Sequence, residues 1–141
     1  MTCRKWPRGS LLLALLAGAS TLGCGKLREV SLCRGIASDV NQALDDIELM
    51  SKAKPLDELR IARRYAALAT TLTPRSVGEK PLAVAVRDYI TVLHATEAAV
   101  RNHDNVQKTQ PTRIGEPRRE LERLVKRDHA AAARIDVECH N

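Results

Sequence analysis

The chain has 141 residues and a net charge of +6, and this length accommodates one ordinary domain. It contains one Trp, two Tyr and no Phe. So few rings argue against a large ligand pocket lined with aromatic side chains and against stacking platforms for single-stranded nucleic acid. Alanine supplies much of the apolar content, which favours closely packed helices because Ala has the best helix propensity and allows close approach.

Residues 1–23 have the pattern of an export signal. Arg4, Lys5 and Arg8 form a basic start, and residues 11–23 form an uncharged apolar stretch. A membrane-spanning helix needs about 20 apolar residues, so this stretch suits a cleaved leader better than a permanent span. Loss of the leader removes those three basic residues and lowers the net charge from +6 to +3. We expect this mild positive balance to favour anionic lipid or polysaccharide over nucleic acid.

The end of the leader reads Ser-Thr-Leu-Gly-Cys at residues 20–24. It resembles the lipobox of bacterial lipoproteins, in which a small residue precedes an invariant cysteine. Gly23 and Cys24 match that pattern and Leu22 is acceptable, whereas Thr21 stands where the family usually has Leu. The resemblance implies that Cys24 is diacylated on sulfur, becomes the mature N-terminus and anchors a periplasm-facing domain to the cell envelope. A glycine follows the cysteine and no Asp does, which under the enteric sorting rule favours the outer membrane over the inner.

The cysteines help to choose between two cleavage sites. Residues 17–19 read Ala-Gly-Ala, a site for ordinary signal peptidase that would release a soluble, secreted protein. Cys3 leaves with the leader in either case, so cleavage after residue 19 would leave three thiols in an oxidising compartment, an awkward odd number. Acylation of Cys24 leaves Cys33 and Cys139, which can pair. We therefore favour the lipoprotein interpretation and keep secretion as its alternative.

Four amphipathic segments follow a short polar tether, which we place at residues 24–30. They are predicted to be helices because their apolar residues recur at spacings of three and four. The expected helices span residues 31–52, 55–72, 81–106 and 117–138. Residues 107–116 form the longest expected joint. Helices and joints of these lengths predict that residues 31–141 form an all-α domain, an antiparallel up-down-up-down four-helix bundle.

The same spacing predicts which side chains face the core. The inward positions are Cys33, Ala37, Val40, Leu44 and Ile47, widened by Ile36, Ala43 and Met50, in the first helix; Ile61, Tyr65, Leu68 and Leu72 in the second; Leu82, Val86, Tyr89, Leu93, Thr96 and Val100 in the third; and Leu121, Leu124, Val125, Ala132 and Ile135 in the fourth. The carboxylate pairs Asp45-Asp46 and Asp57-Glu58 are expected at outward or capping positions. The fourth helix interleaves acids with bases, which is typical of an exposed helix.

Two cysteines test the predicted topology. Cys33 begins the first helix and Cys139 ends the fourth, and these ends are adjacent in an up-down-up-down bundle. We predict a disulfide between them, which the chain-entropy model values at about 4–5 kcal/mol for a loop of this length. Two unpaired buried thiols are the alternative.

The sequence shows no catalytic motif. It contains no H-E-x-x-H, no C-x-x-C, no G-x-S-x-G and no Gly-rich phosphate loop. His94 precedes Glu97 in the reverse of the E-x-x-H order of di-iron bundles. We therefore expect no catalytic residue, no metal site and no cofactor, with His94, His103, His129 and His140 scattered over the surface.

The mature domain leaves two interpretations of function. The first is a non-enzymatic, lipid-anchored bundle with a structural or interaction role, whose partners are the membrane, through the lipid, and an unidentified envelope protein, and not nucleic acid. The second is a small periplasmic redox or metal-binding bundle that uses His94, His103 or His140. Its haem variant depends on Cys139-His140, the second half of a C-x-x-C-H motif in which Asp136 replaces the first cysteine.

Overall fold

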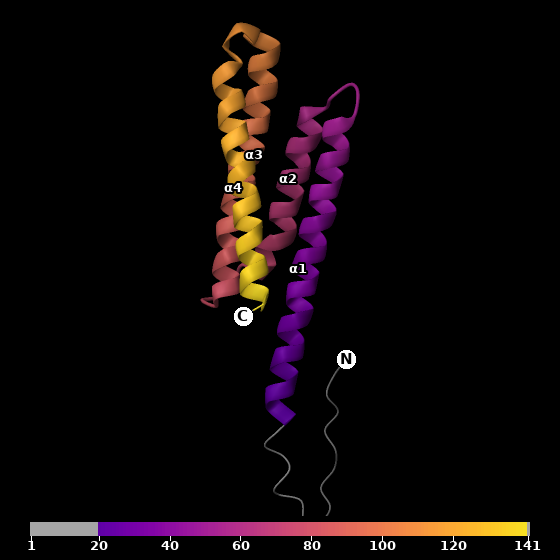
Figure 1. Ribbon diagram of the computed structural model, residues 1–141, viewed down its shortest axis with the longest axis vertical. Coiled ribbons are helices and arrows are strands. Elements are labelled where there is room, and N and C mark those ends of the chain that lie inside the picture. Colours follow the sequence, from indigo (N-terminus) through magenta and orange to yellow (C-terminus); the bar gives the residue numbers. More distant parts are fainter. Residues whose placement is uncertain (1–19, 141) are drawn as a thin grey trace, which may run out of the picture.

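The computed structural model describes residues 20–140, with side chains from Glu29 onward, and every regular element in that part of the chain is helical (Figure 1). The all-α class predicted from the sequence is therefore confirmed. The long helices are α1 (Ser20–Lys52), α2 (Glu58–Leu72), α3 (Pro81–Thr109) and α4 (Gly115–His140). Short 3-10 turns follow α2 at Thr73–Arg75 and precede α4 at Pro111–Arg113. Most of the expected leader, residues 1–19, lies outside the described residues.

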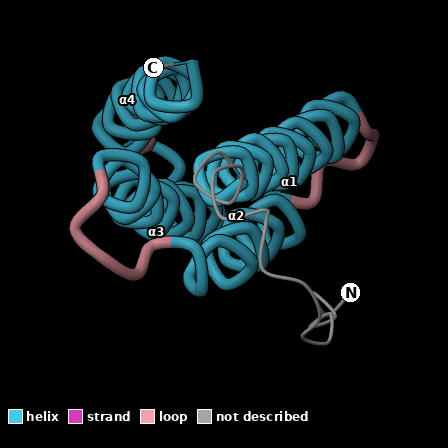
Figure 2. The backbone as a smooth tube through the Cα atoms, turned by 90° about the horizontal axis from the view of Figure 1, so that it is seen from below, coloured by secondary structure: helices cyan, strands magenta, loops and turns pink. Residues whose placement is uncertain are grey.

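Each helix packs against the next helix in the chain. Seen end-on in Figure 2, α1 lies beside α2, α2 beside α3 and α3 beside α4, and the least extensive contact between long helices is that of α1 with α4. The hairpin of α3 and α4 extends past the turn between α1 and α2 at one end, and α1 extends past the other helices at the opposite end (Figure 1). These contacts are compatible with an up-down arrangement.

The core is concentrated on α2 and α3, where the predicted inward residues are all buried. These residues are Ile61, Tyr65, Leu68 and Leu72 of α2 and Leu82, Val86, Tyr89, Leu93, Thr96 and Val100 of α3. On α1 the buried residues are Ile36, Val40 and Ala43, whereas Ala37, which we predicted to face the core, is exposed. The prediction for Ala37 is wrong because α1 buries the face that meets α2 and leaves its α4 side largely open.

Two helix starts differ from the expectation. Helix α1 begins at Ser20, so the expected tether at 24–30 lies inside a helix. Residues 24–30 contain no proline, and Lys, Leu, Arg and Glu within them are good helix formers. Helix α2 begins at Glu58 and not at Pro55, because the Asp57 side chain accepts a hydrogen bond from the backbone N–H of Arg60 at 2.9 Å and caps the first turn.

The joint between α3 and α4 is shorter than expected. Helix α3 continues to Thr109 and α4 already begins at Gly115. The turn between them is closed by backbone hydrogen bonds from Gln110 to Val106 at 2.8 Å and from Arg113 to Gln110 at 2.9 Å. No residue of this hairpin is buried between Val100 and Leu124 in the described structure, so its end is held by local helical bonds and partly buried side chains.

Candidate functional site

A disulfide joins the first and last helices. Cys33 of α1 and Cys139 of α4 are bonded, with their Cα atoms 5.6 Å apart, a normal separation for a bridge. Both cysteines are partly buried and pack against the hydrophobic core. The pairing predicted from the sequence is therefore present in the structure. It fixes α4 to α1 at the place where packing between these two helices is sparse.

An apolar groove lies beside the disulfide. We call it the α1–α4 groove; its volume is about 560 Å³, and its lining includes Cys33, Ala37, Val40 and Leu44 of α1 and Ala132 and Ile135 of α4. Its existence explains why several inward positions of α1 and α4 are only partly buried. The lining also contains the charged or ionisable side chains of Arg34 of α1 and of Asp136 and His140 of α4.

The residue that the leader pattern singles out, Cys24, is part of α1. Its backbone continues as an uninterrupted helix to Cys33, but its side chain lies outside the described side chains. A helix rises 1.5 Å per residue, so Cys24 lies about 13 Å along the axis from the bridged cysteine. Within the described part of the chain, none of the helices has both the length and the apolar character needed to cross a membrane.

A buried carboxylate, which we did not single out from the sequence, lies on the inner face of α4. Asp128 is 1% exposed, and burial raises its pKa, while the Tyr89 phenol and His129 oppose part of that rise. Neither Asp128 Oδ1 nor the Tyr89 hydroxyl has a well-formed hydrogen bond within the described residues. A buried polar atom without a partner lowers the stability of the fold.

Tyr65 of α2 and Tyr89 of α3 are the only tyrosines in the chain, and both are buried near Asp128. Burial, with a contribution from the Asp128 charge, raises the pKa of Tyr65 to about 12. Burial and the same carboxylate also raise the pKa of Tyr89 far above its usual range. Both phenols therefore stay protonated at neutral pH, and α2, α3 and α4 each contribute one member of this buried polar group.

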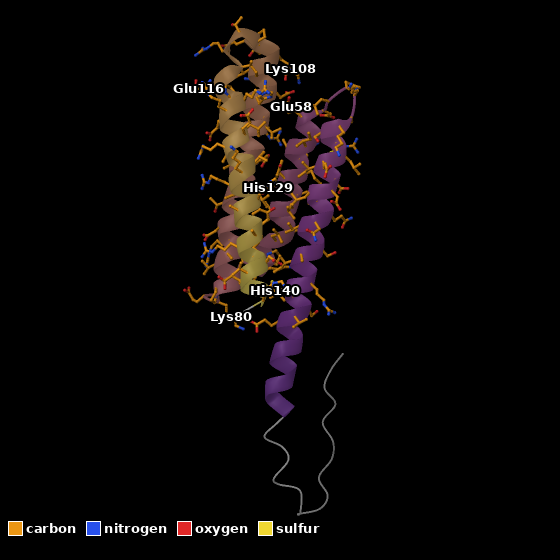
Figure 3. The ribbon with its side chains drawn as sticks, viewed as in Figure 1. Glu58, Lys80, Lys108, Glu116, His129 and His140 are labelled. Atoms are coloured by element: carbon orange, nitrogen blue, oxygen red, sulfur yellow. A yellow bond between two sulfur atoms is a disulfide. The ribbon has the colours of Figure 1, made fainter. Side chains whose placement is uncertain are left out.

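A second polar pair links α2 to α3. Glu58 Oε2 lies 2.8 Å from His103 Nδ1, and both side chains are mostly buried. Figure 3 shows Glu58 at the same end of the molecule as Lys108, where α3 ends. The expectation of an outward or capping position is wrong for Glu58, and that of a surface position is wrong for His103. The two side chains are 45 residues apart in sequence, so only the packing of α2 on α3 brings them together.

The remaining histidines do not gather into a site. His94 lies 3.7 Å from Glu97, a ring nitrogen of His140 lies 2.7 Å from the Asp136 carbonyl oxygen, and His129 is exposed. Among the residues that the structure describes, no three His, Cys, Asp or Glu side chains are placed to hold a metal ion. The sulfur of Cys139 is bonded to Cys33, so it offers no thiol for haem attachment.

Comparison with known proteins adds no assignment to this geometry. No family model, no curated protein and no solved structure matches the chain.

One signal in the sequence could have revealed the buried carboxylate. Asp128 lies four residues after Leu124, four before Ala132 and seven before Ile135, and these spacings place it on the apolar stripe of the fourth helix. An acidic residue on such a stripe is unusual, because an acid is rarely buried without a partner.

Proposed function

We propose that this protein is a lipid-anchored helical bundle of the bacterial cell envelope with a non-enzymatic structural or protein-interaction role. The Cys33–Cys139 disulfide carries the proposal. Stable disulfides are typical of exported proteins and rare in the reducing cytosol. With these two cysteines paired and Cys3 removed with the leader, acylation of Cys24 leaves no free thiol in the mature chain.

We also propose that the four helices form an antiparallel up-down-up-down bundle. Contacts between helix ends support this topology. Lys80 directly precedes α3, and its Nζ atom lies 3.4 Å from Oε1 of Glu29 in the N-terminal third of α1. This contact supports the same direction for α1 and α3. The pairing of Glu58 at the start of α2 with His103 in the last turns of α3 supports opposite directions for α2 and α3.

The anchor would hold the bundle by one end. Cys24 lies near the N-terminal end of α1, the end that extends past the other helices (Figure 1). A lipid on this residue would present the hairpin of α3 and α4 away from the membrane, into the periplasm. The glycine after Cys24 favours the outer membrane. We expect the partner to be another envelope protein and the bundle to carry no cofactor and bind no nucleic acid.

Replacing the acylated cysteine tests the anchor. In cells fed labelled palmitate, we expect Cys24→Ser to abolish the label and to leave unprocessed or soluble protein, because serine offers no sulfur for acylation. The matched control is Cys3→Ser, which removes a cysteine from the leader and should keep the label.

The mature N-terminus distinguishes the two cleavage sites. Mass spectrometry should find a lipid-modified Cys24 at the N-terminus of the protein purified from membranes. A mature protein that begins at Ser20 would contradict the proposal and support secretion. A visible absorption band or a stoichiometric metal in the purified protein would instead support the redox or metal-binding interpretation.

A further inference from the structure

The end of the molecule at which α1 enters the bundle also carries the loop between α2 and α3. In this loop, Lys80 Nζ forms an ion pair with Glu29 Oε1 of α1 at a distance of 3.4 Å. Figure 3 shows Lys80 at the same end as His140, near the C-terminus of α4. The loop is thus held beside the segment of α1 that follows Cys24.

This loop exposes an apolar side chain to solvent. Val77 is 80% exposed, and Gly78 after it has a φ of 112°, a backbone conformation that glycine adopts far more readily than other residues. Val77 borders a hollow of about 300 Å³ whose apolar lining also includes Leu32, Leu82 and Ala83. Val30 and Leu32 of α1 are exposed as well. An exposed apolar side chain therefore lies beside a hollow that is lined by apolar residues and by the charged residues Glu29, Arg75 and Lys80.

The distance from the proposed anchor places this end near the membrane surface. Five residues of continuous helix separate Cys24 from Glu29, which corresponds to about 7–8 Å along the axis. The headgroup layer of one leaflet is about 5–8 Å thick, because a bilayer of roughly 40–45 Å contains a hydrocarbon core of about 30 Å. With Cys24 acylated at the edge of the hydrocarbon, the Glu29–Lys80 contact would lie at the outer edge of the headgroups.

The charges of the α1 segment and the loop at this end favour an anionic surface. Within residues 26–34 of α1 and 76–80 of the loop, basic residues outnumber acidic ones. The basic residues are Lys26, Arg28, Arg34 and Lys80, and the acidic ones are Glu29 and Glu79. The Lys80 side chain is largely exposed. Lys and Arg near an anionic leaflet each contribute about 1 kcal/mol of attraction, and exposed apolar side chains beside them insert between headgroups.

We propose that the loop between α2 and α3, through its exposed Val77 and Lys80 side chains, makes a second, non-covalent contact with the anionic phospholipid surface. This inference rests on the proposed lipid anchor at Cys24. The anchor alone would hold the protein through one helix end and leave the bundle free to tilt. The loop contact restrains that tilt and orients the bundle upright on the membrane.

A tryptophan placed in the loop reports on this contact, because the only native tryptophan, Trp6, leaves with the leader. The probe is Val77→Trp, and the matched control is Leu49→Trp, at a 70% exposed position 25 residues beyond Cys24 on α1. Each lipid-modified variant is reconstituted into vesicles of phosphatidylethanolamine and phosphatidylglycerol that contain a spin-labelled phospholipid. Both sites are exposed, so we expect both variants to melt like the parent protein.

We expect the emission of the Val77→Trp variant to shift to shorter wavelength, since tryptophan settles at the membrane interface when it can reach it. The spin-labelled lipid should quench this emission about twofold more strongly than that of the Leu49→Trp variant. Equal quenching of the two variants in protein that carries its lipid would overturn the loop contact and leave the anchor intact. A blue shift of the Val77→Trp emission without lipid quenching would overturn it in favour of a protein contact. Absence of lipid on the purified protein would overturn the anchor and this inference together.

Discussion

The contact between α2 and α3 and the contact between α1 and α4 are built on different principles. Between α2 and α3, apolar stripes interlock, and Leu68, Leu72, Val86 and Leu93 are almost completely inaccessible to solvent. Between α1 and α4, packing is sparse, a groove of about 560 Å³ remains open, and a disulfide supplies the link. The first contact derives its stability from burial, and the second derives much of its stability from a covalent bond that restricts the unfolded chain.

This difference suggests where the molecule can change without losing its fold. Close-packed side chains tolerate little change in volume, so substitutions between α2 and α3 should be costly. A groove wall that faces solvent can lose a methyl group at lower cost. Four predictions, in order of decreasing effect, test this contrast.

The largest effect is expected in the centre of α3. Leu93 is completely buried, so Leu93→Ala should cost roughly 2–5 kcal/mol of unfolding free energy. Leu44→Ala, at a half-buried position in the α1–α4 groove, should cost less than about 2 kcal/mol, because little cavity forms where solvent already enters. Denaturant melts measure both. The exposed substitution Arg119→Ala should stay within about 0.5 kcal/mol. Equal losses for Leu93→Ala and Leu44→Ala would remove the distinction between the two contacts.

Removal of the disulfide tests the other contact. The double variant Cys33→Ser/Cys139→Ser should lose about 2–4 kcal/mol, because the unfolded chain regains the freedom that the bridge removes. Non-reducing peptide mapping of the parent protein should recover the two cysteine peptides as one crosslinked species. We expect reduction of the parent to reproduce the loss and to leave the double variant unchanged. Two freely alkylated thiols in the native, non-reduced protein would contradict the structure.

Replacement of the buried carboxylate should raise the free energy of unfolding in a pH-dependent way, whereas the core and disulfide substitutions above should lower it. The pKa of Asp128 is raised in the folded state, so its protonated form is the one that the fold favours. Its contribution to stability is fully present below the unfolded pKa of about 3.9 and is lost as the pH rises through the folded pKa. Asp128→Asn removes the charge and keeps the shape. We expect the variant to be more stable than the parent by about 1–3 kcal/mol at pH 7.

Measurement at two pH values separates charge from packing at Asp128. The advantage of Asp128→Asn should shrink toward zero near pH 4, where more of the parent carboxyl is protonated. Exposed Asp45 provides the control, and Asp45→Asn should change the free energy of unfolding by less than about 0.5 kcal/mol at either pH. If Asp128→Asn destabilises the protein equally at both pH values, the pKa of this carboxyl is not raised in the folded state.

The smallest effect concerns the beginning of α2. Asp57→Ala should cost about 1 kcal/mol, because the N–H of Arg60 loses its side-chain acceptor. Asp57→Ser keeps an acceptor at the cap and should retain most of the stability. Thermal or denaturant melts of the two variants give the comparison. A cost for serine as large as that for alanine would show that the cap is not what fixes the start of α2.

The buried residues of α2 and α3 could be predicted from the sequence more accurately than those of α1. The stripes of α2 and α3 could be predicted from spacing alone, because a helix with neighbours on both sides buries the whole width of its apolar face. For α1 the spacing gave an amphipathic helix but placed Ala37 inward, because the pattern does not tell which side of the stripe a neighbouring helix will cover. The start of α1 was wrong for a related reason: nothing in residues 20–30 stops a helix.

The polar groups of the core were the least predictable. The Glu58–His103 pair joins residues that are distant in sequence, so no local pattern predicts it. Asp128 does lie on an apolar stripe, but its place near Tyr65 and Tyr89 depends on how α4 is rotated against α2 and α3. Side-chain environment is a property of the packed helices and not of the spacing on any one of them.

By itself, the sequence determined an all-α domain with four helices and the inner faces of α2 and α3, because the apolar period is a local property of each helix. It also predicted the pairing of Cys33 with Cys139, from the number of cysteines and the expected topology. Only the tertiary structure decided that α1 and α4 leave a groove, that Asp128 is buried with its Oδ1 atom unpaired among the described residues, and that Lys80 of the loop between α2 and α3 lies beside Glu29 of α1. The reason is that these features depend on the rotation and spacing of whole helices, which are set by all their contacts together.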